Sequence, residues 1–326
     1  MSHRQDQSNA VTATPCCACE NTTAQKQDGV VIDPKLAALL PENIFFIESK
    51  RVAAIMQEMG YESHLDLLHE ILKLAARRAR PPISSFYVGT VGLSQAGHIY
   101  CGGNIEFDGL SLNDSIHGEQ CLIARLVNAD EKGMVCFSVN APPCGHCRQF
   151  INELDVGELK IAITGKGTFS LDQLLPFSFG PNDLGNAIRL LQHPSYAITT
   201  LQQLPHADPA PEARLVEVAV KAASRAYSPY TECPSGVALR LKDGSTYRGS
   251  YIENAAYNPS LPPLQSALTG LVGDERQWTE IEACVLVERK GALISQEGIT
   301  RRLLASIAPQ ASFHVYNIDK CVKETS

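Results

Sequence analysis

Apolar residues recur along the chain first at helical spacing and then at strand spacing. Over residues 65–80 they lie three and four positions apart and stop at a Pro-Pro pair, which predicts a helix. Residues 86–93 and 98–107 predict two strands joined by a turn. Strands that alternate with helices indicate a layered α/β fold with a mixed sheet. The further predicted elements are a helix from about residue 117, a strand over 134–140, a helix over 145–154 and a strand over 159–164.

The second half of the chain repeats the first. Residues 75–89 placed over residues 222–236, at an offset of 147, agree at six of fifteen positions. Further along, two residues are lost, and Gln120 then falls on Gln265 at an offset of 145. Similarity at a nearly fixed offset indicates that one fold is used twice.

Composition divides the chain into four parts. Residues 1–40 begin with a segment rich in Ser, Thr, Gln and Asn, and we expect a disordered or weakly ordered tail there. Residues 41–185 form the first domain. Residues 186–212 are rich in Pro, Gln, His and Asn and predict a linker, and residues 213–326 form the second copy.

Charge and composition narrow the classes of partner. The 326 residues carry a formal net charge of −7, without the basic footprint of a polynucleotide-binding protein. No window approaches the roughly 20 apolar residues of a membrane span, and the N-terminus lacks the apolar core of a secretory signal. Most of the eleven cysteines are scattered singly, which is typical of a reducing compartment. We expect neither a nucleic-acid nor a membrane partner, and a cytosolic location.

The candidate chemistry lies in two short motifs of the first domain. His117-Gly118-Glu119 is followed by Pro143-Cys144-Gly145-His146-Cys147. A Cys-x-x-Cys pair that opens a helix places two thiols within reach of one ion, and His117 adds a third ligand that suits zinc. With three protein ligands the tetrahedral site keeps one position open for water, as catalytic zinc sites do.

Glu119 is the candidate proton carrier of this zinc site. It lies two residues from the ligand His117, so it can stand beside the bound water and act as general acid and base. Simpler explanations also exist, since His117 and Glu119 could be a polar helix start, and Cys144 and Cys147 a redox pair. The occurrence of both motifs together, each at a predicted helix start, favours a catalytic site with one Zn²⁺ per chain.

Longer segments around these motifs carry a resemblance to a known family. The chain resembles the long, dimeric, zinc-dependent cytidine deaminases of plants and enteric bacteria, over about residues 45–320. H-x-E followed by P-C-x-x-C is the signature of the zinc deaminases. The resemblance implies a duplicated three-layer cytidine-deaminase-like α/β domain, with a mixed central sheet flanked by helices. It also implies deamination of cytidine and deoxycytidine, a nucleoside as the small-molecule partner, and a homodimer. The segments that carry it are 84–89, 103–107, 115–120, 141–150 and 179–184, with 253–259 and 261–265 in the second copy.

The resemblance also implies roles for five residues outside the zinc ligands. Asn104 and Glu106 would bind the ribose hydroxyls, and Phe86 would pack on the cytosine ring, with an ordinary core position of this strand phenylalanine as the alternative. Phe179 would close the base pocket, across the dimer interface. Gly118 stands where the family usually has alanine, and its backbone N–H would donate to the base carbonyl.

The second copy lacks the residues of the zinc site. Pro262 occupies the position of His117 and Leu264 that of Glu119, while Glu297 and Thr300 fall roughly on the two cysteines. We therefore expect a degenerate, non-catalytic repeat with a role in the interface. The resulting homodimer would hold four domain copies and two active sites.

Two other functions remain open from the sequence. A polynucleotide cytidine deaminase would use the same metal site, but the acidic balance and an acid at Glu106 disfavour a polyanion. A catalytically impaired paralogue acting as a binding protein would hold zinc without turnover.

Overall fold

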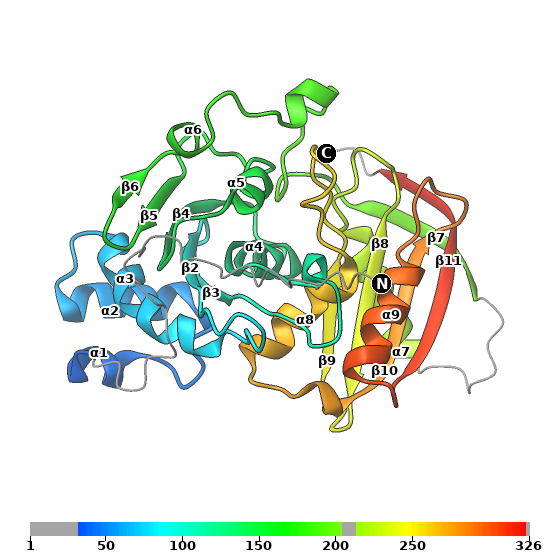
Figure 1. The fold of residues 1–326 in the computed structure, drawn as a ribbon, viewed down its shortest axis with the longest axis horizontal. Coiled ribbons are helices and arrows are strands. Elements are labelled where there is room, and N and C mark those ends of the chain that lie inside the picture. Colours follow the sequence, from blue (N-terminus) through cyan, green and yellow to red (C-terminus); the bar gives the residue numbers. More distant parts are fainter. Residues whose placement is uncertain (1–31, 204–212, 324–326) are drawn as a thin grey trace, which may run out of the picture.

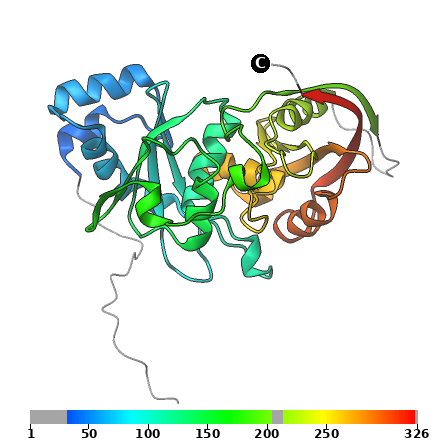
Figure 2. The same cartoon turned by 90° about the horizontal axis from the view of Figure 1, so that it is seen from above.

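A computed structural model of the protein describes residues 32–203 and 213–323 of the chain. Two sheets lie on opposite sides of a central pair of helices, α4 (Gly118–Asn128) and α8 (Pro263–Gly273) (Figure 1). Seen from above, the two halves of the chain lie side by side (Figure 2). None of the helices in these described ranges is long and apolar enough to cross a membrane.

The first sheet has six strands in the order β1-β3-β2-β4-β5-β6, of which only β4 and β5 pair in parallel. Its strands are β1 (Phe46–Ile47), β2 (Gly89–Ser94), β3 (Ile99–Gly103), β4 (Met134–Val139), β5 (Lys160–Ile163) and β6 (Gly167–Phe169). The other helices of this half are α1 (Pro34–Leu39), α2 (Ser49–Met59), α3 (His64–Ala75), α5 (Gly145–Ile151) and α6 (Leu171–Leu174), with the 3-10 turns η1 (Ala76–Arg78), η2 (Leu112–Asp114) and η3 (Pro181–Leu184).

The second sheet has five strands in the order β7-β11-β10-β8-β9, and here β10 and β11 are the parallel pair. Its strands are β7 (Tyr196–Gln203), β8 (Ser235–Leu241), β9 (Thr246–Ser250), β10 (Ile281–Arg289) and β11 (Ser312–Lys323). Besides α8, this half contains α7 (Ala213–Ser224), α9 (Glu297–Ile307) and the 3-10 turn η4 (Trp278–Glu280).

Helices cover both faces of the first sheet. The buried side of α3, with Leu68, Ile71 and Leu72, belongs to the same apolar cluster as Val91 of β2. The buried residues of α4 belong to a second cluster, which continues into the other half of the chain. The predicted duplicated three-layer α/β fold with a mixed sheet is therefore confirmed.

Contacts as well as elements are duplicated. Ile105 forms an isolated antiparallel bridge with Ile116, and in the second half Ile252 forms the same bridge with Leu261. Gln120 donates through Nε2 to the backbone carbonyl of Pro259, at 3.0 Å. These repeated contacts place the start of α8 in the position that the start of α4 has in the first half.

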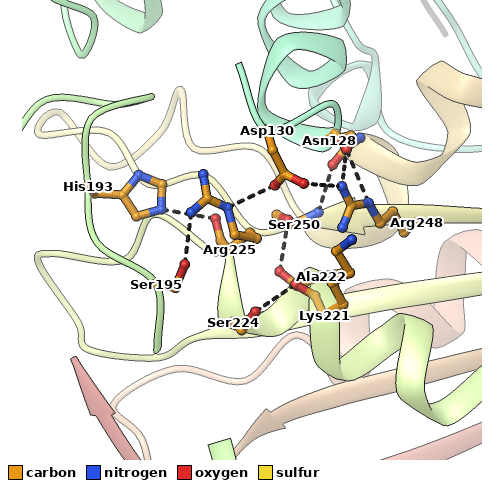
Figure 3. A network of polar contacts seen from close by, with 10 residues as sticks. All are labelled: Asn128, Asp130, His193, Ser195, Lys221, Ala222, Ser224, Arg225, Arg248 and Ser250. Carbon is orange, nitrogen blue, oxygen red and sulfur yellow. Dashed lines mark hydrogen bonds and ion pairs between the residues drawn. The ribbon is translucent and has the colours of Figure 1, made fainter. Parts of the chain in front are cut away.

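Interdomain hydrogen bonds and ion pairs follow the same approximate two-fold symmetry. Gln265 of α8 donates to a carbonyl of the first half, which returns the contact that Gln120 makes. Asp130, just beyond α4, lies 2.9 Å from Arg225 Nε and 2.8 Å from Arg248 Nη2 (Figure 3). Arg78 and Glu275 are the repeat-related residues of Arg225 and Asp130. They form the ion pair that corresponds to Arg225–Asp130, 2.7 Å apart, on the other side of the interface. The two repeats therefore pack on each other through equivalent surfaces.

Two segments depart from the predicted division of the chain. Residues 1–31 of the predicted tail lie outside the described residues, but residues 34–39, also assigned to that tail, form α1 with Leu36 buried. The predicted linker over 186–212 contains β7, which pairs antiparallel with β11. The linker prediction is wrong for this strand because polar residues interrupt its apolar pattern, although Ile198 and Leu201 pack on a buried cluster.

Candidate metal centre and adjoining cavity

Three side chains converge where α4 and α5 begin. His117 directly precedes α4, Cys144 directly precedes α5, and Cys147 lies in the first turn of α5. His117 Nδ1 lies 3.4 Å from Cys144 Sγ and 3.3 Å from Cys147 Sγ, and the two sulfurs are 3.6 Å apart. The structure thus brings the three predicted ligands to one point.

This spacing fits a zinc ion. Zn–S bonds of about 2.3 Å and Zn–N bonds of about 2.0–2.1 Å at tetrahedral angles separate two sulfurs by about 3.8 Å, and sulfur from nitrogen by about 3.6 Å. The observed separations are within a few tenths of an ångström of these values. A search of the described residues for convergent His, Cys, Asp and Glu ligands finds this group, with its ligand atoms within 4.8 Å of one another. Two thiolates and an imidazole are a donor set that suits zinc.

The surroundings of Cys144 favour its thiolate. Hydrogen bonds with Cys147 and His117 lower the pKa of Cys144 to about 3, despite partial burial. The hydrogen bond with Cys144 in turn raises the pKa of His117. Cys144 also sits at the N-terminus of α5, where the helix dipole stabilises negative charge. The surroundings of Cys144 therefore favour the form in which a thiol binds a cation, and the hydrogen bond with Cys144 and burial raise the pKa of its neighbour Cys147.

Glu119 lies beside the three convergent side chains. Its side chain is buried, with 4% of the residue exposed, and Cys147 Sγ lies 3.1 Å from its Oε2. Burial raises the pKa of Glu119, which brings the carboxyl group closer to the pH range in which it can both accept and release a proton. This position, next to but outside the ligand group, is the one predicted for a proton carrier.

Further contacts hold the start of α4 in place. The ring of His146 stacks on that of His117, with centroids 5.0 Å apart and an interplanar angle of 28°. Thr90 Oγ1 donates to the carbonyl of Gly118 at 2.9 Å. Gln120 Oε1 accepts from the backbone N–H of His117 at 3.1 Å. Both the ring and the backbone of His117 are therefore restrained.

A cavity of about 510 Å³ opens over the metal centre. Its volume lies within the range of pockets for small organic ligands, roughly 300–1,000 Å³. The predicted site residues that line it are Phe86, Asn104, Glu106, His117, Gly118, Glu119, Cys144 and Cys147.

Asn104 and Glu106 are already hydrogen-bonded to the backbone. Glu106 Oε2 accepts from the N–H groups of Ile83 and Ser84 at 2.9 and 2.8 Å, and Oε1 accepts from Ser84 Oγ at 2.5 Å. The amide of Asn104 accepts one backbone bond and donates another, both at 2.9 Å. A carboxylate has about four acceptor sites, and an amide has two donor and two acceptor sites. Both side chains therefore retain capacity for a bound hydroxyl.

The two aromatic residues of the predicted site differ in position. Phe86 lines the cavity and is 40% exposed, so the alternative that it is ordinary core is wrong. Phe179 is 48% exposed and lies outside the set of described residues that line the cavity. Its carbonyl accepts hydrogen bonds from Gln149 and Asn152, which fix its backbone. A role for its side chain depends on a second chain and remains a prediction.

Gly118 lies where space is limited. A Cβ added to it would approach Val88 Cγ1 to 3.0 Å and Thr90 Cγ2 to 3.3 Å, which is closer than ordinary packing. Alanine at this position would therefore require Val88 to shift slightly. Gly118 has the same backbone N–H donor that an alanine would have. The predicted contact with a base carbonyl requires only this donor.

Sequence reasoning missed part of the cavity wall. Leu112, Ser115 and Pro142 also line the cavity. Pro142 directly precedes the P-C-x-x-C motif, so its proximity could have been inferred from the chain. Leu112 stands between Ser111 and the polar run Asn113-Asp114-Ser115, and an apolar residue in that setting was the available signal.

The second copy offers no zinc ligands at the equivalent positions. Pro262 precedes α8 as His117 precedes α4, and Leu264 takes the position of Glu119. Gln296 directly precedes α9, so it, and not Glu297, matches Cys144. The predicted match of Glu297 with Cys144 is therefore one residue too far along the chain.

Comparisons with known proteins agree with this geometry. Residues 62–163 and 171–301 each match a family described as the cytidine and deoxycytidylate deaminase zinc-binding region. Cytidine deaminase 1 of Arabidopsis thaliana is 40% identical over 293 residues, which cover 84% of this chain and 97% of that protein. The cytidine deaminase of Serratia proteamaculans is 39% identical over 273 residues, 83% of this chain and 89% of that protein. The cytidine deaminase of Photorhabdus laumondii is 40% identical over 264 residues, 80% and 86% of the two chains.

These matches extend through both repeats, and the three convergent ligands lie within the first matched region. The relatives are matched over nearly their whole length, so the similarity is not confined to one domain. The chain belongs to the zinc-binding cytidine deaminase family.

Proposed function

We propose that the protein hydrolyses cytidine and 2′-deoxycytidine to uridine and 2′-deoxyuridine, with release of ammonia. The observation that carries this proposal is the buried Glu119 beside three convergent zinc-type ligands, in the wall of a cavity of about 510 Å³. The names of the similar proteins support it, since they are cytidine deaminases. Such a reaction belongs to pyrimidine salvage, and we place it in the cytosol.

The chain's own residues account for binding and proton transfer. Zinc, when held by His117, Cys144 and Cys147, supplies the Lewis acidity that lowers the pKa of a water from about 15.7 towards about 7. Glu119 takes the proton of the water that adds to C4 of cytosine and delivers it to the ring nitrogen N3. The same carboxylate then takes the proton of the new C4 hydroxyl and passes it to the amino group, so that the C4 carbonyl forms as the C4–N bond breaks and ammonia leaves. The N–H of Gly118 donates to the base carbonyl and orients the ring, so that N3 and C4 face Glu119.

Three other residues that line the cavity favour a free nucleoside. Phe86 offers an aromatic face for the base, while Asn104 and Glu106 offer acceptors for ribose hydroxyls. A carboxylate at Glu106 repels a phosphate group, and the chain has a formal net charge of −7. Both properties argue against nucleotides and polynucleotides as substrates.

A substrate panel tests this proposal. Zinc-loaded protein is incubated with cytidine, deoxycytidine, cytidine monophosphate and a cytosine-containing single-stranded DNA oligonucleotide, and deaminated products are quantified by chromatography. We expect the two nucleosides to react and the two phosphate-bearing substrates to remain unchanged. Conversion of the oligonucleotide would support a polynucleotide deaminase instead. Zinc-loaded, folded protein that converts none of the four would support the impaired paralogue.

Replacement of Glu106 by glutamine weakens nucleoside binding in this account. A hydrogen bond to a charged group contributes about 1.5–3 kcal/mol, so the E106Q variant is expected to raise KM for cytidine by about ten-fold or more. Initial rates over a range of cytidine concentrations measure this. We expect kcat to fall less than kcat/KM, because Glu106 contacts the sugar and not the reacting ring.

Glu253 provides a matched control for this substitution. It is the repeat-related residue, and it accepts from the N–H groups of Tyr230 and Thr231 and from the Thr231 hydroxyl, as Glu106 does from Ile83 and Ser84. Glu253→Gln removes the same kind of backbone support without touching the cavity. Equal KM values in the two variants would contradict a substrate role for Glu106.

We further propose that the protein is a homodimer. Large apolar residues are exposed in the segment after α6, which supports an interface there. They are Phe177, Phe179, Leu184 and Ile188. Light scattering on purified protein tests the proposal, with an expected mass of twice the 35.4 kDa of one chain. A single-chain mass for active protein would contradict it and would also remove the role proposed for Phe179 across the interface.

A further inference from the structure

The loop before His117 forms one wall of the cavity. It runs from Phe107 to His117 and includes η2, and its residues Leu112, Ser115 and Ile116 face the cavity. Several backbone hydrogen bonds of this loop stay within it, for example from Asp114 N–H to the Ser111 carbonyl at 2.9 Å. Its C-terminal end is paired to the first domain by the bridge between Ile116 and Ile105, whereas the part around Asp114 is held largely by side chains of the second half.

The degenerate repeat supplies those attachments. Arg302 of α9 lies 2.6 Å from Asp114 through Nη2 and Oδ1. Gln265 of α8 donates to the backbone carbonyl of the same residue at 3.1 Å. Ser306 Oγ donates to the carbonyl of Asp108 at 3.4 Å. The loop that leads into the metal centre is thus held from the other half of the chain.

Asp114 is the principal anchor of the loop. Its side chain is 3% exposed, whereas that of Arg302 is 51% exposed, so a buried carboxylate is reached by an arginine from the surface. A buried carboxylate without a cation is costly, and loss of the partner leaves that cost uncompensated. The structure predicts that the loop would move to bring Asp114 into water if Arg302 were removed.

This ion pair breaks the approximate symmetry of the two repeats. The glutamine contacts are reciprocal, since Gln120 reaches Pro259 and Gln265 reaches Asp114. Asp114 and Pro259 are repeat-related, and Pro259 has no carboxylate to pair. The charged contact therefore runs in one direction, from the degenerate repeat to the loop of the repeat that holds the metal centre.

We propose that Arg302 is a positioning residue: through Asp114 it holds the loop that presents the zinc ligand His117 and the wall of the substrate cavity. The degenerate repeat thereby shapes the metal site of its own chain. This inference deepens the proposed function and rests on it for the effect on turnover. The effects on the loop and on metal retention can be measured without any substrate.

The adjacent Arg301 allows a matched test. It lies on the same helix, pairs with Glu297 at 2.7 Å and stacks over Phe313, all within the degenerate repeat. Arg302→Ala and Arg301→Ala are compared with unmodified protein in the full-length, zinc-loaded form. Hydrogen exchange of the 108–117 segment is recorded, together with the rate of zinc transfer to a chromogenic chelator and the kcat and KM for cytidine.

We expect Arg302→Ala to release zinc about ten-fold faster or more, to lose protection in residues 108–117 and to lower kcat/KM for cytidine by a similar factor, because a hydrogen bond to a charged group is lost. Arg301→Ala is expected to stay within about two-fold of unmodified protein in each readout, since an exposed i,i+4 pair contributes little. Arg302→Lys, which keeps the charge but not the planar fork, is expected to restore part of the loss.

A double variant tests whether Arg302 acts through Asp114. If it does, Asp114→Asn combined with Arg302→Ala releases zinc no faster than Arg302→Ala alone, whereas independent effects would multiply. If unmodified protein holds zinc and converts cytidine, equal zinc release, exchange and kcat/KM in Arg302→Ala and Arg301→Ala would overturn the role of Arg302. The proposed function would then be unaffected. Unmodified protein that holds zinc but converts neither nucleoside would overturn the proposed function, while the loop and zinc-release readouts would still decide the role of Arg302.

Discussion

Replacement of Glu119 by glutamine is expected to lower the rate of cytidine deamination by about four orders of magnitude, the upper end of what a general acid–base group contributes. Glutamine keeps the shape of the side chain but cannot accept the proton of the attacking water. Because the carboxylate serves successive proton transfers in this mechanism, no other side chain replaces it. Initial rates, followed by the loss of cytidine absorbance, measure the effect.

The same substitution is expected to leave zinc bound. Glu119 lies beside the ligand group but is not a member of it, so metal content by atomic absorption should match that of unmodified protein. Glu158→Gln, an exposed change in the same domain, serves as the control and should alter neither property. A Glu119→Gln protein that keeps more than about a tenth of the rate would contradict the assigned proton transfer, since this corresponds to only about 1.4 kcal/mol.

Replacement of Cys144 by alanine is expected to remove the metal and, with it, the activity. Even loss of an outer partner of a metal ligand costs about 10–100-fold in metal affinity, so loss of one of three protein ligands should cost more. After dialysis against a chelator, unmodified protein should keep its zinc and the Cys144→Ala variant should not. Since a ligand that binds only the folded state stabilises it, the variant should also melt at a lower temperature.

Cys321 gives the control for this substitution. It lies in β11 of the degenerate repeat, far along the chain from the metal centre, and it is partly exposed. Cys321→Ala should retain zinc and turnover, which separates loss of a ligand from loss of any thiol. Retention of zinc by Cys144→Ala after the chelator step would mean that the ion is held elsewhere.

The positions of the metal-site residues could be predicted because each lies at a helix start. His117 and Cys144 directly precede helices, and Cys147 is one turn further on. The geometry of a helix N-terminus is nearly constant, so spacing in the sequence translates into spacing in the structure. The same holds for the repeat, where a fixed offset correctly located the start of α8.

Other features depend on contacts that spacing does not encode. Helix α2 was not predicted because only Val52 and Ile55 in it are buried, which makes its apolar stripe thin. The ion pair between Asp114 and Arg302 joins residues 188 positions apart, and each is an ordinary charged residue in its own segment. Only the packing of the two repeats brings them together.

The second repeat therefore also contributes contacts to the metal-site half of the chain. It keeps the hydrogen bonds that hold a glutamate to the backbone, as Glu253 shows, although Pro262 and Gln296 stand at the positions of the ligands His117 and Cys144. It also keeps the reciprocal glutamine contact and adds the charged one from Arg302.

A titration of metal-free protein with zinc tests whether one zinc ion per chain, held by the first repeat, carries the reaction. The rate of cytidine conversion to uridine is measured after each addition, at a protein concentration well above the dissociation constant of the site. We expect the rate to rise linearly and to level off at one zinc ion per chain. One repeat has the three ligands, and the other has none at the equivalent positions. A rate that is independent of zinc, or one that levels off only at two zinc ions per chain, would contradict this expectation.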